Sequence, residues 1–335
     1  MTTRSAHRLF TIGLNPYGLT YTVGLQAFGT PRANPQPLGL DGFIGLAREL
    51  NVPCIELDWR WLTPLPDAEL ARVRSALDGM LVVYSHWLSL EPGETLADAV
   101  ARAKAIGARI LRLHLTPVLE GARATWGARW PEMVQHARRT LLREAPGVEA
   151  AGLTLAIENH QDFGSEELLA LVEALGEYAG LVLDTGNPFS VGEDPLAFAR
   201  RAAHRIRHVH LKDYVAQFTD EGYRLVRCAI GDGCVPFEAI AAALAEHHAS
   251  LTASIEPGAL ESRHIRLFTS EWWKGYPPRD ARELGVMLGR LRHNRLKDDA
   301  DCRTPWERDA PQELIAYEVG QMHRSIENLR ALGWM

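Results

Sequence analysis

Four ionisable side chains in the second half of the chain each stand at the end of a short apolar run. They are Glu158 in LAIENH, Asp184 in LVLDTGN, His210 in IRHVHLKD and Glu256 in LTASIEPG. A buried carboxylate is costly unless it is paired or bound to a metal. An ion pair with Arg or Lys would satisfy any single one of these groups, but four of them at one place would repel one another without a cation. The pattern therefore predicts a divalent metal site.

The ligand set indicates which metal would bind. Three carboxylates and one imidazole make an oxygen-rich site that suits Mn²⁺ or Mg²⁺, with Co²⁺ as a further option. Zn²⁺ also accepts His and carboxylate ligands. We expect one divalent ion, with Mn²⁺ as the first choice, and we expect water or two neighbouring substrate oxygens to complete its coordination.

The apolar runs that carry these ligands belong to a regular alternation of strand and helix patterns. Runs rich in Val, Ile and Leu predict strands at 20–25, 53–58, 81–86, 109–115, 153–159, 181–185, 206–211 and 251–257. Helical spacing of apolar residues predicts helices near 41–50, 67–78, 94–106, 131–144, 165–176, 194–203, 236–248 and 311–332. Ser165 is the expected N-cap of the clearest helix.

Eight strands that are each followed by a helix predict an α/β fold, the (β/α)8 TIM barrel. A doubly wound open sheet alternates in the same way, but it rarely needs eight units, and no GxGxxG lies near the first predicted strand. In a barrel the carboxyl ends of the strands converge on one mouth, which would bring the four ligands together.

One segment interrupts the alternation after the eighth predicted strand. Residues 259–308 are rich in Arg, His and Trp, and we expect them to contain two helices. Loops that follow barrel strands emerge on the catalytic face, so this helical insertion is well placed to be a lid or a substrate wall. The alternative is that it covers a helix or forms a dimer contact. Residues 1–258 and 309–335 would then form the barrel itself.

The motifs IENH, LDTGN, HVHLKD and SIEPG, in this order, resemble the xylose-isomerase-like TIM barrel superfamily. The most similar branch is the sugar phosphate isomerase/epimerase group, which includes ketose 3-epimerases and keto sugar acid decarboxylases. The resemblance implies that the four ligands hold one divalent metal, and that Glu158 and Glu256 also move protons. Several family epimerases carry a His three residues after the strand-six Asp, where this chain has Asn187. Asn cannot titrate, so the resemblance indicates the superfamily rather than a strict ketose epimerase.

The chemistry implied is metal-assisted carbanion formation on a small keto sugar or sugar derivative. A metal that chelates a carbonyl and an adjacent hydroxyl would stabilise an enediolate. In an isomerase or epimerase, one of Glu158 and Glu256 removes a proton and the other returns it. A decarboxylase or an eliminating lyase that acts on a keto sugar acid starts from the same species, so the metal ligands do not separate these reactions.

Further side chains near the predicted strand ends are candidates for substrate binding. They are His86, His114, His160, Asn187, Lys212, Arg227, Arg263 and Arg266. The histidines could contact substrate or be packed residues. Lys212 could neutralise an oxyanion or form a salt bridge, and the arginines could grip a carboxylate with a bidentate fork or tie loops together. The sequence GDG at 231–233 could bind phosphate, but Asp232 would oppose an anion, so we expect a substrate without phosphate.

Composition limits the partners. The 335 residues carry a net charge of −6, which argues against nucleic acid as the main partner. The four cysteines show no CxxC spacing, and the N-terminus resembles neither a signal peptide nor a membrane anchor, so we expect a cytoplasmic protein with no membrane contact. We expect a sugar-like small molecule as the partner, with a homo-oligomer as a possibility.

Two other classes of function stay open. One is a DNA-repair nuclease of the same fold, with about three zinc ions that His86, His114 and His208 would help to bind. The other is a binding module or a subunit of a larger complex.

Overall fold

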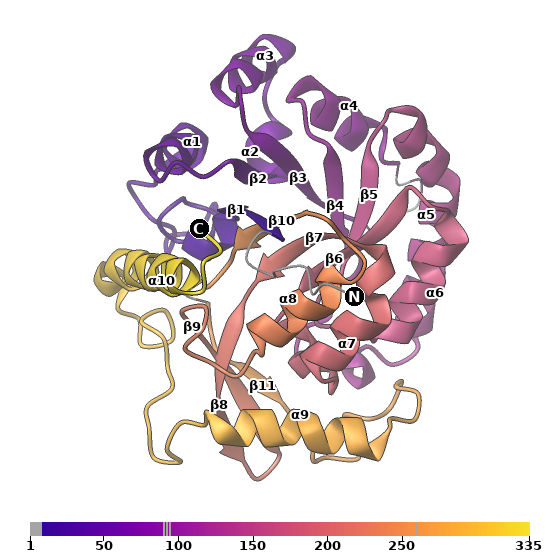
Figure 1. The fold of residues 1–335 in the computed structure, drawn as a ribbon, viewed down its shortest axis with the longest axis vertical. Coiled ribbons are helices and arrows are strands. Elements are labelled where there is room, and N and C mark those ends of the chain that lie inside the picture. The colour runs from indigo at the N-terminus through magenta and orange to yellow at the C-terminus, as the bar shows by residue number, and fades with distance from the viewer. Residues whose placement is uncertain (1–8, 90, 92, 94, 259) are drawn as a thin grey trace.

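The structure is a computed structural model that describes residues 9–89, 91, 93, 95–258 and 260–335. Eight parallel strands form a closed barrel in the order β1-β10-β7-β6-β5-β4-β3-β2 (Figure 1). They are β1 (Phe10–Leu14), β2 (Cys54–Asp58), β3 (Leu81–Trp87), β4 (Ile110–His114), β5 (Thr154–Glu158), β6 (Ala179–Asp184), β7 (Ile206–Leu211) and β10 (Leu251–Ile255). The predicted TIM barrel is confirmed.

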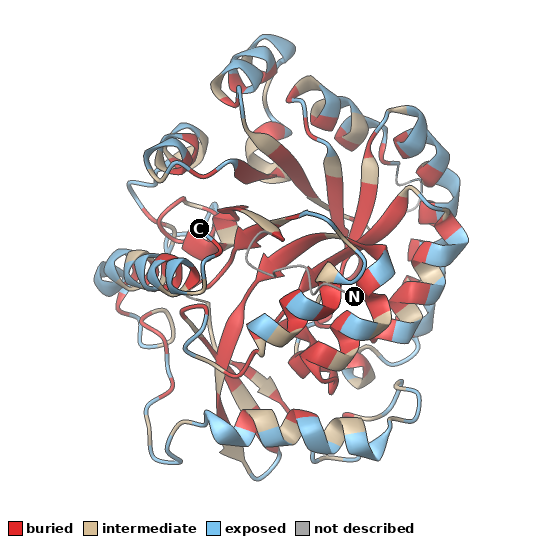
Figure 2. Ribbon diagram, viewed as in Figure 1, coloured by how far each residue is buried: buried red, intermediate tan, exposed pale blue. Residues whose placement is uncertain are grey.

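Helices surround the barrel and cover its outer face (Figure 1). They are α1 (Gly39–Glu49), α2 (Trp59–Leu62), α3 (Asp67–Ala76), α4 (Ala97–Ala105), α5 (Arg129–Ala150), α6 (Ser165–Leu175), α7 (Pro195–Ala202), α8 (Phe237–Ala245) and α10 (Pro311–Ala331). Figure 2 shows the barrel strands mostly buried, while each helix has a buried inner stripe and an exposed outer stripe. In α6 the stripe contains Leu168, Val172 and Leu175, at the spacing of one helix face. The N-cap of α6 is Gly164, one residue before the predicted Ser165.

The first barrel strand lies ten residues before the predicted one. β1 pairs with β10 from Phe10 opposite Leu251 to Leu14 opposite Ile255. The predicted strand at 20–25 is wrong, because these residues form a buried turn. The carboxylate of Glu318 in α10 accepts hydrogen bonds from the backbone N–H groups of residues 21 and 22, at 2.9 and 2.8 Å. A side chain thus replaces the strand ladder that would otherwise satisfy this buried backbone.

A second, smaller sheet extends from the mouth of the barrel. β8 (Asp213–Thr219) and β9 (Gly222–Cys228) form a hairpin directly after β7, and β11 (Arg263–Ile265) pairs with β9 in an antiparallel sense. The helix α9 (Ala281–His293) lies along this sheet (Figure 1). Its Met287 and Leu291 are buried.

The described part of the segment 260–308 therefore contains one strand and one α-helix, where two helices were expected. The expected boundary residue, 259, lies outside the described residues. Because β11 completes a sheet begun by the hairpin after β7, the loops that follow the seventh and eighth barrel strands form one structure.

Two expectations from composition can be compared with the structure. No helix within the described residues is long and apolar enough to cross a membrane. The four cysteines are all free thiols. The N-terminal residues 1–8, which were expected to lack a targeting signal, lie outside the described residues.

Candidate metal centre

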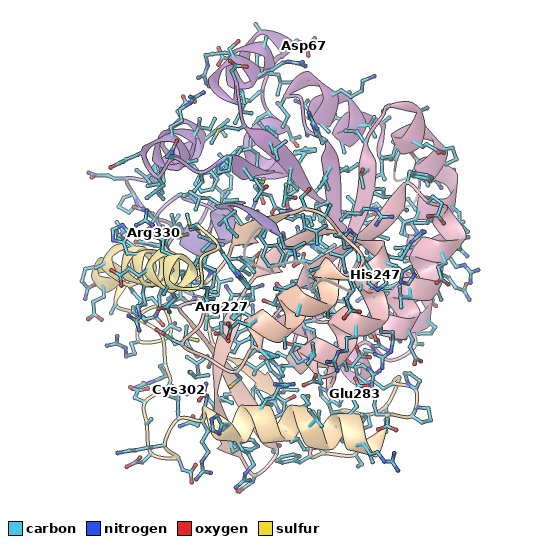
Figure 3. All side chains as sticks on the ribbon, viewed as in Figure 1. Asp67, Arg227, His247, Glu283, Cys302 and Arg330 are labelled. Atoms are coloured by element: carbon cyan, nitrogen blue, oxygen red, sulfur yellow. The ribbon has the colours of Figure 1, made fainter. Side chains whose placement is uncertain are left out.

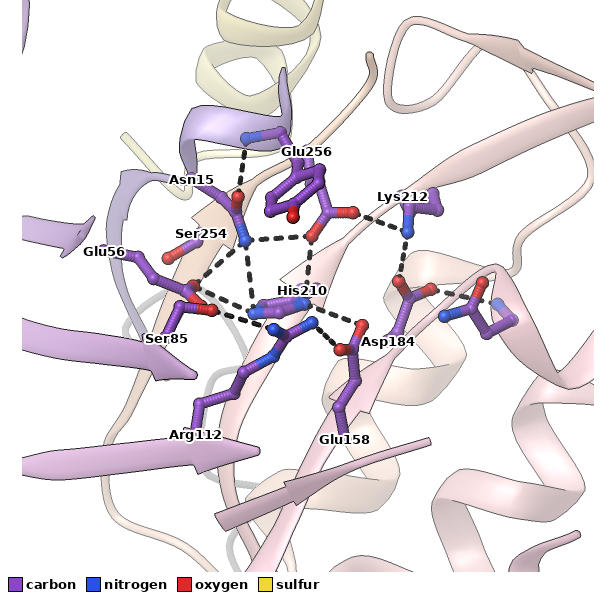
Figure 4. Close-up of polar contacts among 12 residues, drawn as sticks. Asn15, Glu56, Ser85, Arg112, Glu158, Asp184, His210, Lys212, Ser254 and Glu256 are labelled. Carbon is purple, nitrogen blue, oxygen red and sulfur yellow. Dashed lines mark hydrogen bonds and ion pairs between the residues drawn. The ribbon is translucent and has the colours of Figure 1, made fainter. Parts of the chain in front are cut away.

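The four predicted ligands meet at the mouth of the barrel. Glu158 and Asp184 are the last residues of β5 and β6, His210 is in β7, and Glu256 directly follows β10. All four are buried, and each offers one ligand atom within 4.8 Å of the others. Asp184 and His210 are partners in the β6–β7 register, which fixes their spacing. The structure thus brings together side chains that lie up to 98 residues apart (Figure 4).

His210 lies at the centre of this group. Its Nδ1 is 3.2 Å from Glu158 Oε1 and 3.0 Å from Glu256 Oε2, and its Nε2 is 2.9 Å from Glu56 Oε2. Burial opposes a charged imidazole, but Glu56 and Glu256 outweigh burial and raise the pKa of His210 to about 9. A metal that binds His210 would have to displace this proton.

Two cationic side chains neutralise part of the cluster. The Lys212 Nζ lies 2.5 Å from Asp184 Oδ2 and 2.6 Å from Glu256 Oε1. Burial disfavours the ammonium, but Asp184 and Glu256 raise the pKa of Lys212 overall. Arg112 in β4 forms an ion pair with Glu158 and donates a hydrogen bond of 2.8 Å to Ser85 Oγ.

The charges fit one divalent cation. Glu56, the fourth carboxylate beside Glu158, Asp184 and Glu256, is fully buried. When His210 is neutral, four carboxylates face two cations, and the difference of two negative charges is what one divalent ion supplies. The oxygen-rich donor set is also of the kind that Mg²⁺ and Mn²⁺ prefer. The residues present therefore fit the metal that the motifs imply.

Sequence reasoning missed three residues that touch the ligands: Asn15, Glu56 and Arg112. The Asn15 Nδ2 donates to Glu56 Oε2 at 3.0 Å and to Glu256 Oε2 at 2.9 Å. Asn15 directly follows β1, so it was overlooked when the first strand was placed at 20–25. Glu56 in CIELD and Arg112 in ILRLH are charged residues inside apolar strands, a signal that was available but was not used.

Three of the predicted substrate-binding histidines lie in a row at the ends of β3, β4 and β5. The ring centres of His114 and His160 are 5.4 Å apart, and Trp87 stacks on His114 at 6.3 Å. Trp59 continues the row with His86 at 5.9 Å. Burial lowers the pKa of His86 to about 4 and that of His114 to about 3, so both rings are neutral at pH 7. The row offers flat, uncharged ring faces beside the metal centre.

Asn187 orients the Asp184 carboxylate, and its own side-chain oxygen has no hydrogen-bond partner among the described residues. Its backbone N–H, like that of Gly186, donates to Asp184 Oδ1 at 2.9 Å. Its side-chain Nδ2 donates to the backbone of Asn159, while the buried Oδ1 has no partner among the described residues. Asn187 therefore holds the Asp184 carboxylate in place and has an acceptor available.

The three predicted arginines have different surroundings. Arg227 and Arg263 are buried, with exposed fractions of 6% and 8%. Arg266 lies on the surface, where its Nε is 3.2 Å from Glu221 Oε2. Arg227 and Arg263 are thus enclosed by the protein, whereas Arg266 is placed to join two loops.

The loop 231–233 does not offer its amides to a phosphate. The buried Asp213 carboxylate accepts hydrogen bonds from the backbone N–H groups of Gly231, Gly233 and Val235, at 3.0, 2.9 and 3.1 Å. In many barrels such amides after strands seven and eight bind phosphate. Here an internal carboxylate takes that role.

A closed parallel barrel with a buried Glu-Asp-His-Glu cluster at its mouth is a TIM barrel whose side chains could hold a metal ion. Residues 44–266 match the Xylose isomerase-like TIM barrel family, and the chain belongs to this family.

Relatives of the chain include several kinds of enzyme. A 3-oxo-isoapionate decarboxylase from Pectobacterium atrosepticum is 22% identical over 234 residues, which make up 68% of this chain and 78% of the relative. An inosose dehydratase from Clostridium beijerinckii is 31% identical over 115 residues, 30% of this chain and 39% of the relative. The chain spans only 28–39% of the length of three curated relatives that it matches. Among solved structures, an L-ribulose 3-epimerase aligns with 97% of this chain over 98% of its own length, with a TM-score of 0.53 and 16% sequence identity. This similarity is one of fold.

Proposed function

We propose that the protein is a divalent-metal-dependent isomerase or epimerase of a small keto sugar or sugar derivative, with Mn²⁺ as its metal. The observation that carries the proposal is the placement of Glu158 and Glu256. Their carboxylates approach the same His210 nitrogen from β5 and β10, at 3.2 and 3.0 Å. Two carboxylates at one centre allow one to accept a proton from substrate while the other supplies one.

Neighbouring side chains keep Glu256 ionised. Burial opposes ionisation of Glu256, but Lys212 and His210 outweigh it and hold the pKa of Glu256 well below its usual range. Glu256 therefore starts as a carboxylate that can accept a proton. Lys212 also places a positive charge next to the ligands, where an oxyanion on the substrate would develop. The bound metal would act as a Lewis acid on the substrate carbonyl.

A decarboxylase or lyase that acts on a keto sugar acid is the second candidate. The buried arginines Arg227 and Arg263 favour it, because they suit a substrate carboxylate. The likeness to 3-oxo-isoapionate decarboxylase over 68% of the chain supports the same class. A non-catalytic subunit would instead be inactive alone and would need a partner protein.

One experiment separates these functions. The purified chain is loaded with Mn²⁺ and incubated in D₂O with a panel of keto sugars and keto sugar acids. Deuterium uptake without loss of carbon indicates an isomerase or epimerase, release of carbon dioxide a decarboxylase, and loss of water a lyase. Metal analysis should give about one ion per chain, whereas about three zinc ions would indicate the nuclease type of site. Absence of turnover and of deuterium exchange across the panel would contradict the proposal.

A further inference from the structure

Arg227 is a buried cation that has no counter-ion among the described residues. It lies in β9, next to the barrel (Figure 3), and is 6% exposed. Its buried Nε and Nη1 atoms have no hydrogen-bond partner in the described part of the chain. Burying a charged group without a partner is strongly unfavourable. A guanidinium in this state is therefore a candidate to receive an anion from outside the chain.

Arg263 presents a second guanidinium on the same side of the small sheet. In the pairing of β11 with β9, Arg263 lies opposite Leu225, and side chains two residues apart on a strand share a face. Arg227 and Arg263 therefore lie diagonally on one face. The Arg263 Nε is buried and also lacks a described partner, while its Nη1 lies 3.3 Å from the half-exposed Glu261.

Arg227 lies close to the metal centre, and Arg263 shares its face of the small sheet. The Arg227 Nη1 contacts Gly258, two residues after the ligand Glu256. A Cβ at position 258 would overlap this nitrogen, so the glycine makes room for the guanidinium.

We propose that Arg227 and Arg263 bind the carboxylate of the substrate, so that the enzyme acts on a sugar acid rather than on a neutral sugar. This inference rests on the proposed function, because it takes the metal centre as the place of reaction. One divalent metal would balance the negative charge of the metal centre, and the carboxylate of Glu261 neutralises Arg263. The positive charge of Arg227 is therefore left for the ligand. A single carboxylate matches this charge, and the planar fork of Arg suits its two oxygens.

A phosphate is the other anion that a pair of arginines would bind. Phosphate sites in barrels also use backbone amides, but here the amides of residues 231, 233 and 235 already donate to Asp213. The arginines therefore lack the additional donors that a doubly charged phosphate needs, and the carboxylate is favoured.

The test measures binding, so it does not depend on turnover. Mn²⁺-loaded protein is titrated by calorimetry with aldonates of three to six carbons, each compared with the alditol of the same length. We expect the best aldonate to bind at least about tenfold more tightly than its alditol, on the scale of one charge-assisted hydrogen bond. Arg227→Gln and Arg263→Gln should each remove most of this preference, and Arg227→Lys should retain part of it.

Arg224→Gln is the matched control. Arg224 is three residues from Arg227 on the same strand, so its side chain points to the opposite face, and the preference should be unchanged. If Arg227→Gln does not fold, as judged by its circular dichroism, then Arg227→Lys and Arg263→Gln carry the test. Equal binding of aldonate and alditol by the unmodified protein would overturn the proposal.

Two further titrations distinguish the arginine pair from the metal and from a phosphate site. The first is done without Mn²⁺. If the preference for the aldonate is lost without the metal but kept in the arginine variants, then the metal rather than the arginines binds the carboxylate. That result would overturn the proposal. The second uses inorganic phosphate as a competitor, and phosphate binding tighter than aldonate binding and lost in Arg227→Gln would assign the site to phosphate instead. A protein that binds aldonates through these arginines but shows no isotope exchange would retain the anion site and refute only the proposed reaction.

Discussion

Lys212 and Asp184 form a buried ion pair across the ends of β7 and β6, with 2.5 Å between Nζ and Oδ2. Lys212 also holds Glu256, so one ammonium group bridges two of the four metal ligands. Removal of one partner from a buried ion pair leaves an uncompensated charge, at a cost of about 3–5 kcal/mol. Lys212→Met should therefore lower the free energy of unfolding by about 3 kcal/mol in metal-free protein. Addition of Mn²⁺ should recover much of this loss, because the ion restores positive charge to the cluster.

Denaturant titrations with and without Mn²⁺ measure this effect. The exposed Lys274, which pairs with Glu271 on the surface, supplies the control Lys274→Met, whose stability should change by less than about 0.5 kcal/mol. An equal effect of the two substitutions would show that Lys212 does not balance the carboxylates.

Loss of any ligand should weaken metal binding. Glu158→Gln, Asp184→Asn, His210→Ala and Glu256→Gln each remove a donor or its charge, so the affinity for Mn²⁺ should fall at least about tenfold. Metal content after gel filtration and calorimetric titration provide the measurement. Full occupancy in three of the four variants would mean that the ion binds elsewhere.

The four ligands could be predicted because each one ends an apolar run, at the point where a barrel strand reaches the mouth. The remainder of the centre was harder to predict for a physical reason. Glu56 and Arg112 are opposite charges that lie on different strands, and their partners become apparent only after the barrel closes. A lone charged residue in a strand does not reveal which residue neutralises it.

The first strand shows a different limit of sequence patterns. Tyr21, Val23 and Leu25 alternate with other residues as in a half-buried strand, and all three are buried. Alternation predicts burial of every second residue but not the hydrogen bonds of the backbone, which here form within a turn and with the carboxylate of Glu318. In the same way, the register of β11 with β9 turns Arg263 inward, and no local pattern predicts this register.

Glu158 and Glu256 should contribute more than metal binding. At Mn²⁺ concentrations that saturate Glu158→Gln and Glu256→Gln, a rate deficit of about 10²-fold should remain, the usual contribution of a positioned general base or acid. Steady-state kinetics on the substrate found by the panel, with metal occupancy measured in the same samples, test this. Complete rescue by excess metal would make the two residues ligands only.

Stability should fall on the acid side of neutrality because buried histidines resist protonation. The pKa of His114 is about 3 in the folded chain and 6.5 in its ordinary state. The unfolded chain therefore binds more protons as the pH falls below 6.5, and the free energy of unfolding decreases from there towards pH 3. His114→Gln should make this decrease shallower, as measured by denaturant unfolding at about pH 7 and about pH 5. If the free energy of unfolding of His114→Gln depends on pH as in the unmodified protein, then His114 is not the cause of the lower stability at acid pH.

Gly258→Ala should reproduce the arginine variants without removing a charge. The added Cβ would overlap the Arg227 guanidinium and the backbone oxygen of Tyr17, and the φ of +67° is unfavourable for alanine. The preference for an aldonate over its alditol should therefore fall, as in Arg227→Gln. Gly285→Ala in α9, where an added Cβ meets no atom within 4 Å, is the control and should keep the preference. A variant at 258 that folds and keeps the full preference would show that Arg227 need not lie beside this glycine.

The contacts of Glu318 also have a consequence for the order in which the chain folds during synthesis. The turn at residues 20–25 follows β1, but two of its backbone N–H groups donate to a carboxylate of α10, and β1 itself pairs with β10 as well as with β2. Ribosomes release the N-terminus first, and contacts between distant segments form slowly. The segment around β1 must therefore wait, partly unpaired, until β10 and α10 have been made.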